Sequence, residues 1–279
     1  EWNEPALVGR IGDWVAAQRT VGDAPLLFFH DTHHRVVSEP EAMAAYDLRA
    51  YDGVLAFGRV VHDRYLAAGW TTRAWVWHEA ADTRVFHPLA VDEGAPLPTG
   101  DLVWIGNWGD GERGAELREF LLEPVRSLGL QANVYGVRYP RDALDTLREA
   151  GLTYRGWLPN HEAPRVFARH RLTIHVPRRP YAAALPGIPT IRVFEALACG
   201  IPLICAPWQD SEELFTPGED YLVAHDGAEM RRQLHAVLTD PDLAQSLREH
   251  GLRTVRERHT CAHRVDELLT IVAGLRGAA

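Results

Sequence analysis

Residues 186–207 contain the side chains with the clearest chemical potential in the chain. Their sequence, PGIPTIRVFEALACGIPLICAP, predicts a helix that begins after Thr190 and leads into a buried strand. A helix N-terminus offers free amide groups and a partial positive charge to a diphosphate, and Arg192 adds a guanidinium. Glu195, one turn further along, suits hydrogen bonds from the hydroxyl groups of a ribose or a sugar. A capped helix with Glu195 on a solvated face is the alternative interpretation.

A loop that contains glycine is the second candidate for binding phosphate. Gly106, Asn107 and Gly109 follow the predicted strand DLVWIG and precede a helix that starts near Arg113. Backbone amides and a guanidinium hold phosphate in loops of this kind. A plain turn is the alternative, because the chain has no G-x-G-x-x-G motif there.

Three other side chains are candidates for contacting a ligand near these loops. Arg178 and Arg179 follow the predicted strand LTIHV, where they either contact phosphate or form an ordinary solvated surface. Trp108, within the glycine-containing loop, is placed to stack on a base or a sugar, although most Trp residues of the chain are expected to fill apolar space near strand ends.

Residues 28–40, FFHDTHHRVVSEP, place acid and base groups at the carboxyl end of a predicted strand. Asp31 or His33 can take a proton from a hydroxyl group there, a step worth about 10²- to 10⁴-fold in rate. A metal site made of His30, His33 and His34 is one alternative, although the loop lacks a clear set of further ligands. A polar loop without chemistry is the other.

Residues 78–82, HEAAD, are similar to the zinc protease motif H-E-x-x-H, but Asp82 replaces the second His. That motif requires a helix, whereas the preceding RAWVWH predicts the end of a strand. A protease is therefore not expected. His78 is still predicted to face a cleft, and Glu79 is a candidate acid or hinge contact.

The composition excludes several function classes. The 279 residues are 46% hydrophobic and 24% charged, as in ordinary globular proteins. A net charge of -9 argues against a nucleic-acid partner, since such binding relies on clustered cations. All 29 basic residues are Arg, which excludes lysine Schiff-base chemistry and the Walker lysine. Arginines, backbone amides and helix N-termini must therefore bind any phosphate.

Cysteine usage and hydropathy indicate a cytoplasmic protein. Cys199, Cys205 and Cys261 form no C-x-x-C motif, and their odd number does not suggest a disulfide framework. No apolar run approaches the roughly 20 residues that span a bilayer, and no signal peptide is visible. The chain starts at Glu1 with what reads as the end of a strand, so we expect an N-terminal portion to be missing.

Alternating strands and helices predict α/β units around parallel sheets. The first series has strands ending at His30, Gly58 and His78, with helices at 5–20, 39–50 and 59–69. The second has strands at 101–106, 132–136, 153–158, 172–176, 202–206 and 221–224, with helices at 113–128, 161–170 and 190–199 and a helical tail from 227. Residues 88–100, rich in Pro and Gly, are the predicted linker. Two such domains place a ligand cleft at the carboxyl ends of their strands.

The chain resembles a known group at several of these places. RVFEALACGIPLICAP is similar to the donor-site signature of glycosyltransferases with the GT-B fold, in particular family four and the spore-maturation (CgeB-like) enzymes. HEAADTRVFHP resembles the segment that closes the N-terminal domain in family four, and IGNWGDGERG resembles the first loop of the C-terminal domain. YRGWLPNHEAPRVFARHRLTIHVPRR resembles the following unit. The matches occur in the family's order over residues 78–225.

The resemblance implies an α/β GT-B architecture, with two Rossmann-like domains that face each other across a cleft. The expected divisions are an incomplete acceptor domain at 1–90, a donor domain at 100–258 and a helix at 259–279 that packs back on the first domain. Arg113 stands in the place of a lysine that contacts pyrophosphate, and Gly156 forms a turn near the nucleotide base. The resemblance implies no metal or cofactor, since GT-B enzymes usually neutralise the leaving diphosphate with protein donors.

One position departs from the family. Family four has paired acids eight positions apart, but Gly187 stands eight positions before Glu195. The usual contact to the donor sugar and a retaining outcome are therefore left open. The T-x-R-x-F-E pattern of the CgeB-like group fits Thr190, Arg192, Phe194 and Glu195.

The expected function is the transfer of a sugar from a nucleotide-diphosphate sugar to an unidentified glycan, protein or small-molecule acceptor. Arg113, Arg192 and the helix start near Thr190 are expected to stabilise the leaving diphosphate. Asp31 or His33 is expected to activate the acceptor, and His78 is a further catalytic candidate. Two alternatives are another GT-B enzyme, such as a sugar-nucleotide epimerase, and a non-catalytic sugar- or nucleotide-binding protein of a cell or spore surface.

Overall fold

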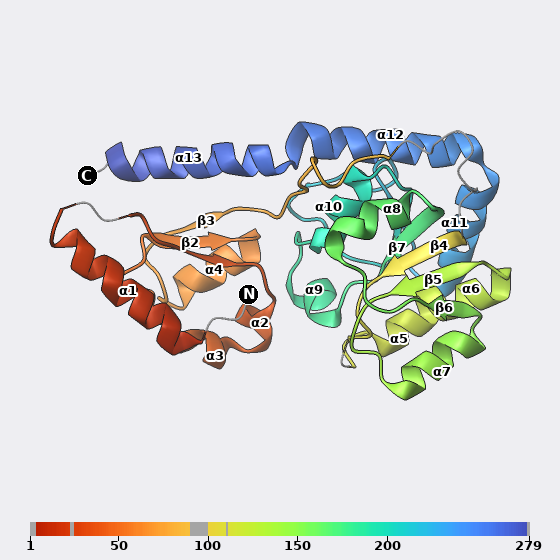
Figure 1. Ribbon diagram of the computed structural model, residues 1–279, viewed down its shortest axis with the longest axis horizontal. Coiled ribbons are helices and arrows are strands. Elements are labelled where there is room, and N and C mark those ends of the chain that lie inside the picture. The colour runs from red at the N-terminus through yellow and green to blue at the C-terminus, as the bar shows by residue number, and fades with distance from the viewer. Residues whose placement is uncertain (1–3, 23–24, 90–99, 110, 278–279) are drawn as a thin grey trace.

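The computed structural model describes residues 4–22, 25–89, 100–109 and 111–277. These residues form two separate parallel sheets. The predicted linker at 88–100 lies mostly outside the described residues. We call the part around the first sheet the N-terminal unit and the part around the second sheet the C-terminal unit (Figure 1).

The N-terminal unit has a three-stranded sheet in the order β1-β2-β3. Its strands are β1 (Phe28–Asp31), β2 (Gly53–Ala56) and β3 (Ala74–Val76). The four residues of β2 are all buried, as expected for a central parallel strand covered on both faces. The helices are α1 (Pro5–Arg19), α2 (Arg35–Ser38), α3 (Pro40–Ala44) and α4 (Arg59–Ala67).

The C-terminal unit has a six-stranded sheet in the order β6-β5-β4-β7-β8-β9, which is the Rossmann order. Its strands are β4 (Gly100–Ile105), β5 (Ala132–Tyr135), β6 (Leu152–Tyr154), β7 (His170–His175), β8 (Leu203–Cys205) and β9 (Leu222–Val223). The order reverses between β4 and β7, and ligands bind at such a switch point in α/β sheets. The predicted α/β class with parallel sheets is confirmed.

Helices cover both faces of the larger sheet. The helical segments that follow β4 in the chain are α5 (Gly114–Leu117), a π-helical turn (Arg118–Leu122), α6 (Glu123–Leu128), α7 (Arg141–Glu149), a 3₁₀ turn (Asn160–Glu162), α8 (Ala163–Phe167), α9 (Arg179–Ala184), α10 (Ile191–Ala198), α11 (Gly227–Thr239), α12 (Pro241–Arg258) and α13 (Cys261–Gly277). Of these, α13 lies along the N-terminal unit (Figure 1). One hydrophobic core includes side chains of α5, α6, α7 and α11, and a second includes those of α8 and α10. None of the helices in the described part of the chain has the length and apolar character to cross a membrane.

A segment of the C-terminal unit inserts into the core of the N-terminal unit. Leu185 and Ile188 are almost fully buried there, among side chains that include Val54 and Phe57. Gly58 permits this approach, because a Cβ at that position would lie 2.2 Å from Cγ1 of Ile188. The inserted segment leads directly to Thr190 and α10, so the packing between the units also positions α10.

The last two helices return along the molecule to the N-terminal unit (Figure 1). The backbone amide of Ala81 donates to the carbonyl of His259 at 3.0 Å, and the amide of Cys261 donates to the carbonyl of Ala81 at 3.0 Å. Trp77, directly after β3, donates from Nε1 to the carbonyl of Arg264 in α13 at 2.8 Å. The domain boundaries expected from the sequence, 1–90, 100–258 and 259–279, stay a prediction.

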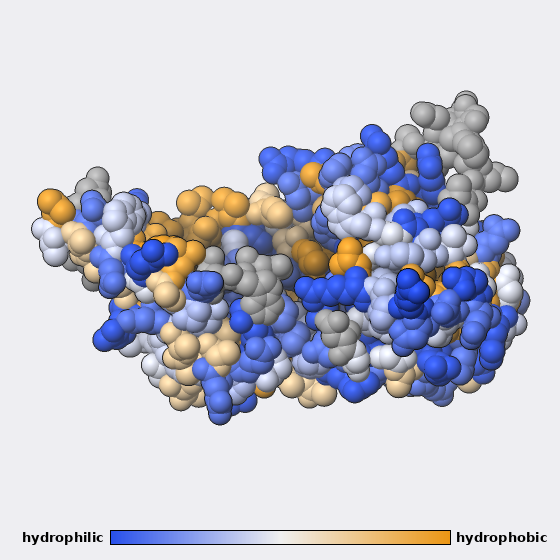
Figure 2. Space-filling model, turned by 60° about the horizontal axis from the view of Figure 1, so that its bottom comes forward, coloured by the Kyte–Doolittle hydropathy of each residue, from blue (hydrophilic) through white to orange (hydrophobic). Residues whose placement is uncertain are grey.

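Apolar surface is gathered on the N-terminal unit. Figure 2 shows it as orange areas on the left of the view, whereas the C-terminal unit on the right is mostly hydrophilic. The exposed apolar side chains in this part include Leu7, Ile11 and Trp14 of α1 and Val265 and Leu269 of α13.

Candidate functional site

A cavity of about 660 Å³ lies between the two units, at the carboxyl ends of β4 and β7. We call it the interface cavity. Seven of the residues predicted from the sequence line it: His33, Gly106, Asn107, Arg113, Arg178, Thr190 and Arg192. Four other predicted residues, Asp31, His78, Gly156 and Glu195, are absent from its lining. The sequence therefore located the cavity but not every residue of its wall.

Arg113 is a buried cation in the wall of the interface cavity. Its side chain is 9% exposed, and Nη1 donates to the carbonyl of Val176 at 2.9 Å. Nη2 donates to the carbonyl of Asn107, and the guanidinium lies 5.2 Å from the ring centroid of Trp104. Burial, followed by the positive charge of Arg178, lowers the pKa of Arg113 to about 10. Within the described residues it forms no ion pair, and its Nε has no hydrogen-bond partner.

The glycine-containing loop is shaped around Arg113. Gly109 has a φ of 98°, and a Cβ there would lie 3.0 Å from Cγ of Arg113. Asn107 accepts a hydrogen bond at Oδ1 from the amide of Val137 at 3.0 Å, which ties the loop to the neighbouring strand end. Trp108 packs against Tyr139 at a centroid distance of 5.8 Å and is absent from the cavity lining, so its predicted stacking role finds no support.

The start of α10 forms another part of the wall. Thr190 precedes the helix, and its Oγ1 lies 3.1 Å from Nε2 of His175, the last residue of β7. Ile191 and Arg192 of the first turn also line the cavity. The first amides of a helix lack intrahelical acceptors, and they carry the positive end of the helix dipole. This end of α10 therefore offers donors to a bound anion.

Arg192 is held by two partners behind the cavity. Its Nη1 lies 2.5 Å from Oε2 of Glu195, and its Nη2 donates to Oδ1 of Asn160 at 3.3 Å. Asn160 donates from Nδ2 to Oε1 of Glu195 at 2.7 Å, which closes a ring of three side chains. Glu195 is 3% exposed, so a solvent-facing Glu195 is wrong. Burial raises the pKa of Glu195, against the opposing effects of Arg192 and Asn160.

Of two other predicted residues, Arg178 lines the interface cavity and Gly156 does not. Arg178 forms an ion pair with Glu112, Nη1 to Oε2 at 3.3 Å, and both side chains line the cavity. Gly156 has a φ of 83°, and its carbonyl accepts from the amide of Gly136 at 2.9 Å. The neighbouring Trp157 does line the cavity and is 71% exposed. At this turn the side chain of Trp157, and not Gly156, therefore faces the cavity.

Asp31 and His33 lie in an adjoining cavity of about 300 Å³, and His33 lines both cavities. Asp31 is 6% exposed and accepts from the amide of His33 at 3.0 Å and the hydroxyl of Tyr65 at 2.9 Å. Burial raises the pKa of Asp31. Burial, with the nearby His34 and Arg35, lowers the pKa of His33 to about 4, so its imidazole is neutral near pH 7. The structure thus brings an acid and a neutral base together beside the interface cavity.

The metal alternative for this loop finds no support. Across the parts of the chain that the structure describes, no three His, Cys, Asp or Glu side chains are grouped to hold a metal ion. His30 instead packs edge-on against Trp77 at 4.7 Å, and His34 bonds through Nδ1 to Oγ of Ser38 at 2.9 Å.

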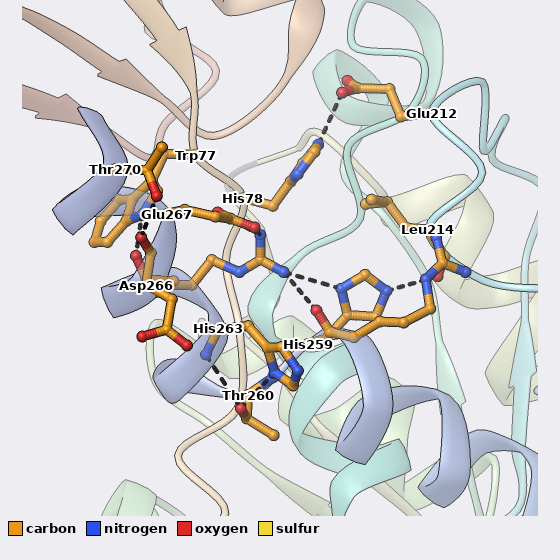
Figure 3. A network of polar contacts seen from close by, with 12 residues as sticks. Trp77, His78, Glu212, Leu214, His259, Thr260, His263, Asp266, Glu267 and Thr270 are labelled. Carbon is orange, nitrogen blue, oxygen red and sulfur yellow. Dashed lines mark hydrogen bonds and ion pairs between the residues drawn. The ribbon is translucent and has the colours of Figure 1, made fainter. Parts of the chain in front are cut away.

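His78 is absent from the lining of the interface cavity. It lines a separate cavity of about 420 Å³, and its Nε2 lies 2.8 Å from Oε2 of Glu212 (Figure 3). Glu212 also accepts at Oε1 from the amide of Arg59, the first residue of α4, at 2.7 Å. The pair therefore joins the two units. Glu212 carried no sequence signal, because its partner is 134 positions away.

The sequence interpretation also missed Glu112, Trp157 and His175 in the cavity wall and Asn160 behind it, and it named His34 only as part of a metal site. Trp157 and Asn160 lie within YRGWLPNHEAPRVFARHRLTIHVPRR, the stretch that resembles a unit of the family's C-terminal domain. That resemblance could have pointed to both residues. His175 is the second-last residue of the predicted strand 172–176, and a polar residue near the carboxyl end of a strand is a signal that could have been used.

Comparisons with known proteins were made for the sequence and for the fold. A family profile described as "Glycosyl transferase-like" matches residues 116–270, more than half of the chain. A search of the curated proteins found no match.

Several solved structures are similar in fold. Anabaena Alr3699/HepE in complex with UDP-glucose has a TM-score of 0.71 at 14% identity, over 98% of this chain and 77% of that one. Sucrose-phosphate synthase from Thermosynechococcus elongatus has a TM-score of 0.65 at 16% identity, over 95% and 72%. The lipopolysaccharide outer core galactosyltransferase WaaB, in its apo form, has a TM-score of 0.58 at 13% identity, over 96% and 79%. At these identities the likeness concerns the fold, and it confirms the architecture expected from the sequence.

Proposed function

The chain belongs to the glycosyl transferase-like family and is a glycosyltransferase, and we propose that it transfers a sugar from a nucleoside-diphosphate sugar bound in the interface cavity. The observation that carries this proposal is the set of donors around that cavity. Arg113 comes from one place in the chain, Arg192 and the uncapped start of α10 come from a second, and together they line one space. A diphosphate is the ligand that matches two guanidinium groups and a helix N-terminus.

These donors also account for the chemistry of the leaving group. As the bond to the sugar breaks, negative charge grows on the diphosphate, and fixed donors stabilise it. The guanidinium of Arg113 is already held by two carbonyls and the Trp104 ring, so it needs no rearrangement. We therefore include metal independence in the proposal.

Acceptor activation is assigned to the carboxyl end of β1 and the loop that follows it. Asp31 and His33 lie in the adjoining cavity, and His33 connects it to the interface cavity. A carboxylate with a raised pKa is a suitable base for a hydroxyl group. His78, whose Nε2 is engaged by Glu212, is assigned to the contact between the units and no longer to acceptor activation.

Three finer assignments belong to the same proposal. A uridine nucleotide is the first candidate donor, because the similar structure of HepE is named as a complex with UDP-glucose. The pattern formed by Thr190, Arg192, Phe194 and Glu195 supports a place in the CgeB-like group. Three free cysteines, of which Cys199 and Cys205 are buried, support a cytoplasmic location.

Calorimetric titration of the protein with UDP, GDP, CDP and dTDP, in the presence of EDTA, tests the donor site. We expect one nucleotide to bind and the variant Arg192→Ala to weaken it about 10- to 100-fold, since a charge-assisted pair of hydrogen bonds is lost. The matched control is Arg179→Ala, because Arg179 is paired with Glu116 and is absent from the cavity lining. Equal losses in both variants, or no binding without a divalent metal, would contradict the proposal.

Turnover is tested separately with the matching nucleotide sugar. Release of the nucleoside diphosphate that increases on addition of an acceptor is the expected result. Conversion of the sugar without any acceptor would instead identify an epimerase.

A further inference from the structure

Thr190 occupies the N-cap of α10 but does not cap it. A threonine at this position normally accepts a hydrogen bond from an amide in the first turn. The side chain of Thr190 makes no such bond. Its hydroxyl is directed instead to His175, at 3.1 Å between Oγ1 and Nε2. The first turn of α10 therefore lacks the side-chain cap that Thr190 could provide.

His175 is placed to hold that hydroxyl. It is the last residue of β7, is 5% exposed and lines the interface cavity. Burial, followed by the charges of Arg113 and Arg192, lowers its pKa to about 3. The imidazole is therefore neutral, and a neutral imidazole can pair with a hydroxyl as donor or acceptor. Its Nδ1 is buried and has no hydrogen-bond partner among the residues that the structure describes, which marks the residue as unusual for a core position.

The contact between Thr190 and His175 affects the backbone amides in the first turn of α10. The amide of Val193 bonds to the carbonyl of Thr190 at 3.0 Å. The amides of Ile191 and Arg192 have no intrahelical acceptor, since they are the first two of the helix. With the hydroxyl drawn to His175, nothing from Thr190 covers them. Ile191 and Arg192 line the cavity, so this end of α10 is open toward it.

We propose that His175 is a positioning residue, which keeps the Thr190 hydroxyl off the first amides of α10 so that they stay free for a phosphate group of the donor. The inference rests on the proposed function, because it assigns a diphosphate to the interface cavity. It goes further in naming a residue that does not itself need to contact the donor. His175 affects nucleotide binding only through Thr190. An experiment that also changes Thr190 can therefore distinguish this role from a purely structural one.

A double-mutant cycle on His175 and Thr190 tests this, with UDP binding measured by calorimetry, or with the nucleotide that the panel above selects. His175→Asn has an amide too short to reach Thr190, so the hydroxyl is released to cap the helix. We expect the Kd to rise about tenfold, as for the loss of one or two hydrogen bonds to a charged group. In the Thr190→Val background no hydroxyl remains, and the same change at His175 is expected to have no further effect.

Two other variants complete the test. His175→Gln keeps a polar atom near the position of Nε2 and is expected to retain binding within about threefold of the wild type. His175→Leu fills a similar volume without polar atoms, and we expect the same loss of binding as for His175→Asn. It serves as the test variant if His175→Asn does not fold. Thermal unfolding without nucleotide identifies the folded variants.

The outcomes separate this inference from the proposed function. Equal losses from His175 replacement in the wild-type and Thr190→Val backgrounds, or no loss in either, overturn the role of His175 and leave the donor site in place. A wild-type protein that binds none of the four nucleotides overturns the donor site and this inference together.

Discussion

Ionisable side chains at the interface cavity act through the partners that hold them. Glu195 was expected to accept hydroxyl groups of a ribose, yet both of its oxygens face protein groups, Arg192 and Asn160. The sequence predicted which residue types meet at this place. It could not predict their pairing, because Asn160 lies 35 positions from Glu195 and only the fold brings them together. The contact of Glu195 with a ribose stays a prediction.

Asp31 allows a prediction about catalysis. Replacement by Asn keeps the shape of the side chain and one accepting oxygen but removes the proton acceptor, so we expect kcat to fall about 10²- to 10⁴-fold while nucleotide affinity is retained. Because burial raises the pKa of Asp31, the wild-type rate should decline on acidification at a higher pH than an ordinary aspartate would give. Steady-state kinetics across pH measures both effects. Asp145→Asn, on the exposed side of α7, is the control, and an Asp31 variant with unchanged kcat would assign acceptor activation elsewhere.

At the scale of elements, the sequence predicted regular strands better than the pieces between them. Apolar runs such as GVLAFG and LTIHV became β2 and β7, since buried parallel strands have a strong pattern. The helix expected at 39–50 was wrong in extent: a helix starts at Pro40 and ends at Ala44. Helix α9 was not predicted either. Both are short elements, and α9 also contacts α2 across the two units, so tertiary packing and not local periodicity decides their structure.

A substitution at Gly58 tests the packing of the inserted segment against the N-terminal unit. A Cβ at this position would lie 2.2 Å from Ile188 and 2.9 Å from Oε1 of Glu212, so Gly58→Ala must displace the inserted segment. We expect the free energy of unfolding to fall by about 1–3 kcal/mol and nucleotide binding to weaken, because that segment leads into α10. Gly9→Ala is the control, since nothing lies within 4 Å of a Cβ there. Urea denaturation compares the two variants, and equal stabilities would contradict the close packing described for Gly58.

At the scale of the whole molecule, one network connects the returning helices to both units (Figure 3). His259, at the end of α12, lies with Nε2 2.7 Å from the carbonyl of Leu214 and with Nδ1 3.3 Å from Nη2 of Arg264. The carbonyl only accepts and the guanidinium only donates, so Nε2 carries the proton and Nδ1 is unprotonated. Arg264 also donates to the carbonyl of Arg258 and to Glu267. A protonated His259 would place a second positive charge against Arg264.

This arrangement predicts a loss of stability in acid. Burial and the neighbouring arginines lower the pKa of His259 to about 4, although the Leu214 contact opposes this. The unfolded chain, with an ordinary His pKa near 6.5, then binds the proton more readily than the folded protein between about pH 6.5 and 4. The contribution of His259 is complete above pH 6.5 and is lost as pH falls to about 4, by about 1–3 kcal/mol. Urea unfolding at pH 7, 5.5 and 4.5 should show a smaller decline for His259→Gln, which keeps a donor toward Leu214 without titrating. A decline as steep as in the wild type would assign the acid sensitivity to other groups, and the junction of α12 and α13 would not be the part of the molecule that responds to pH.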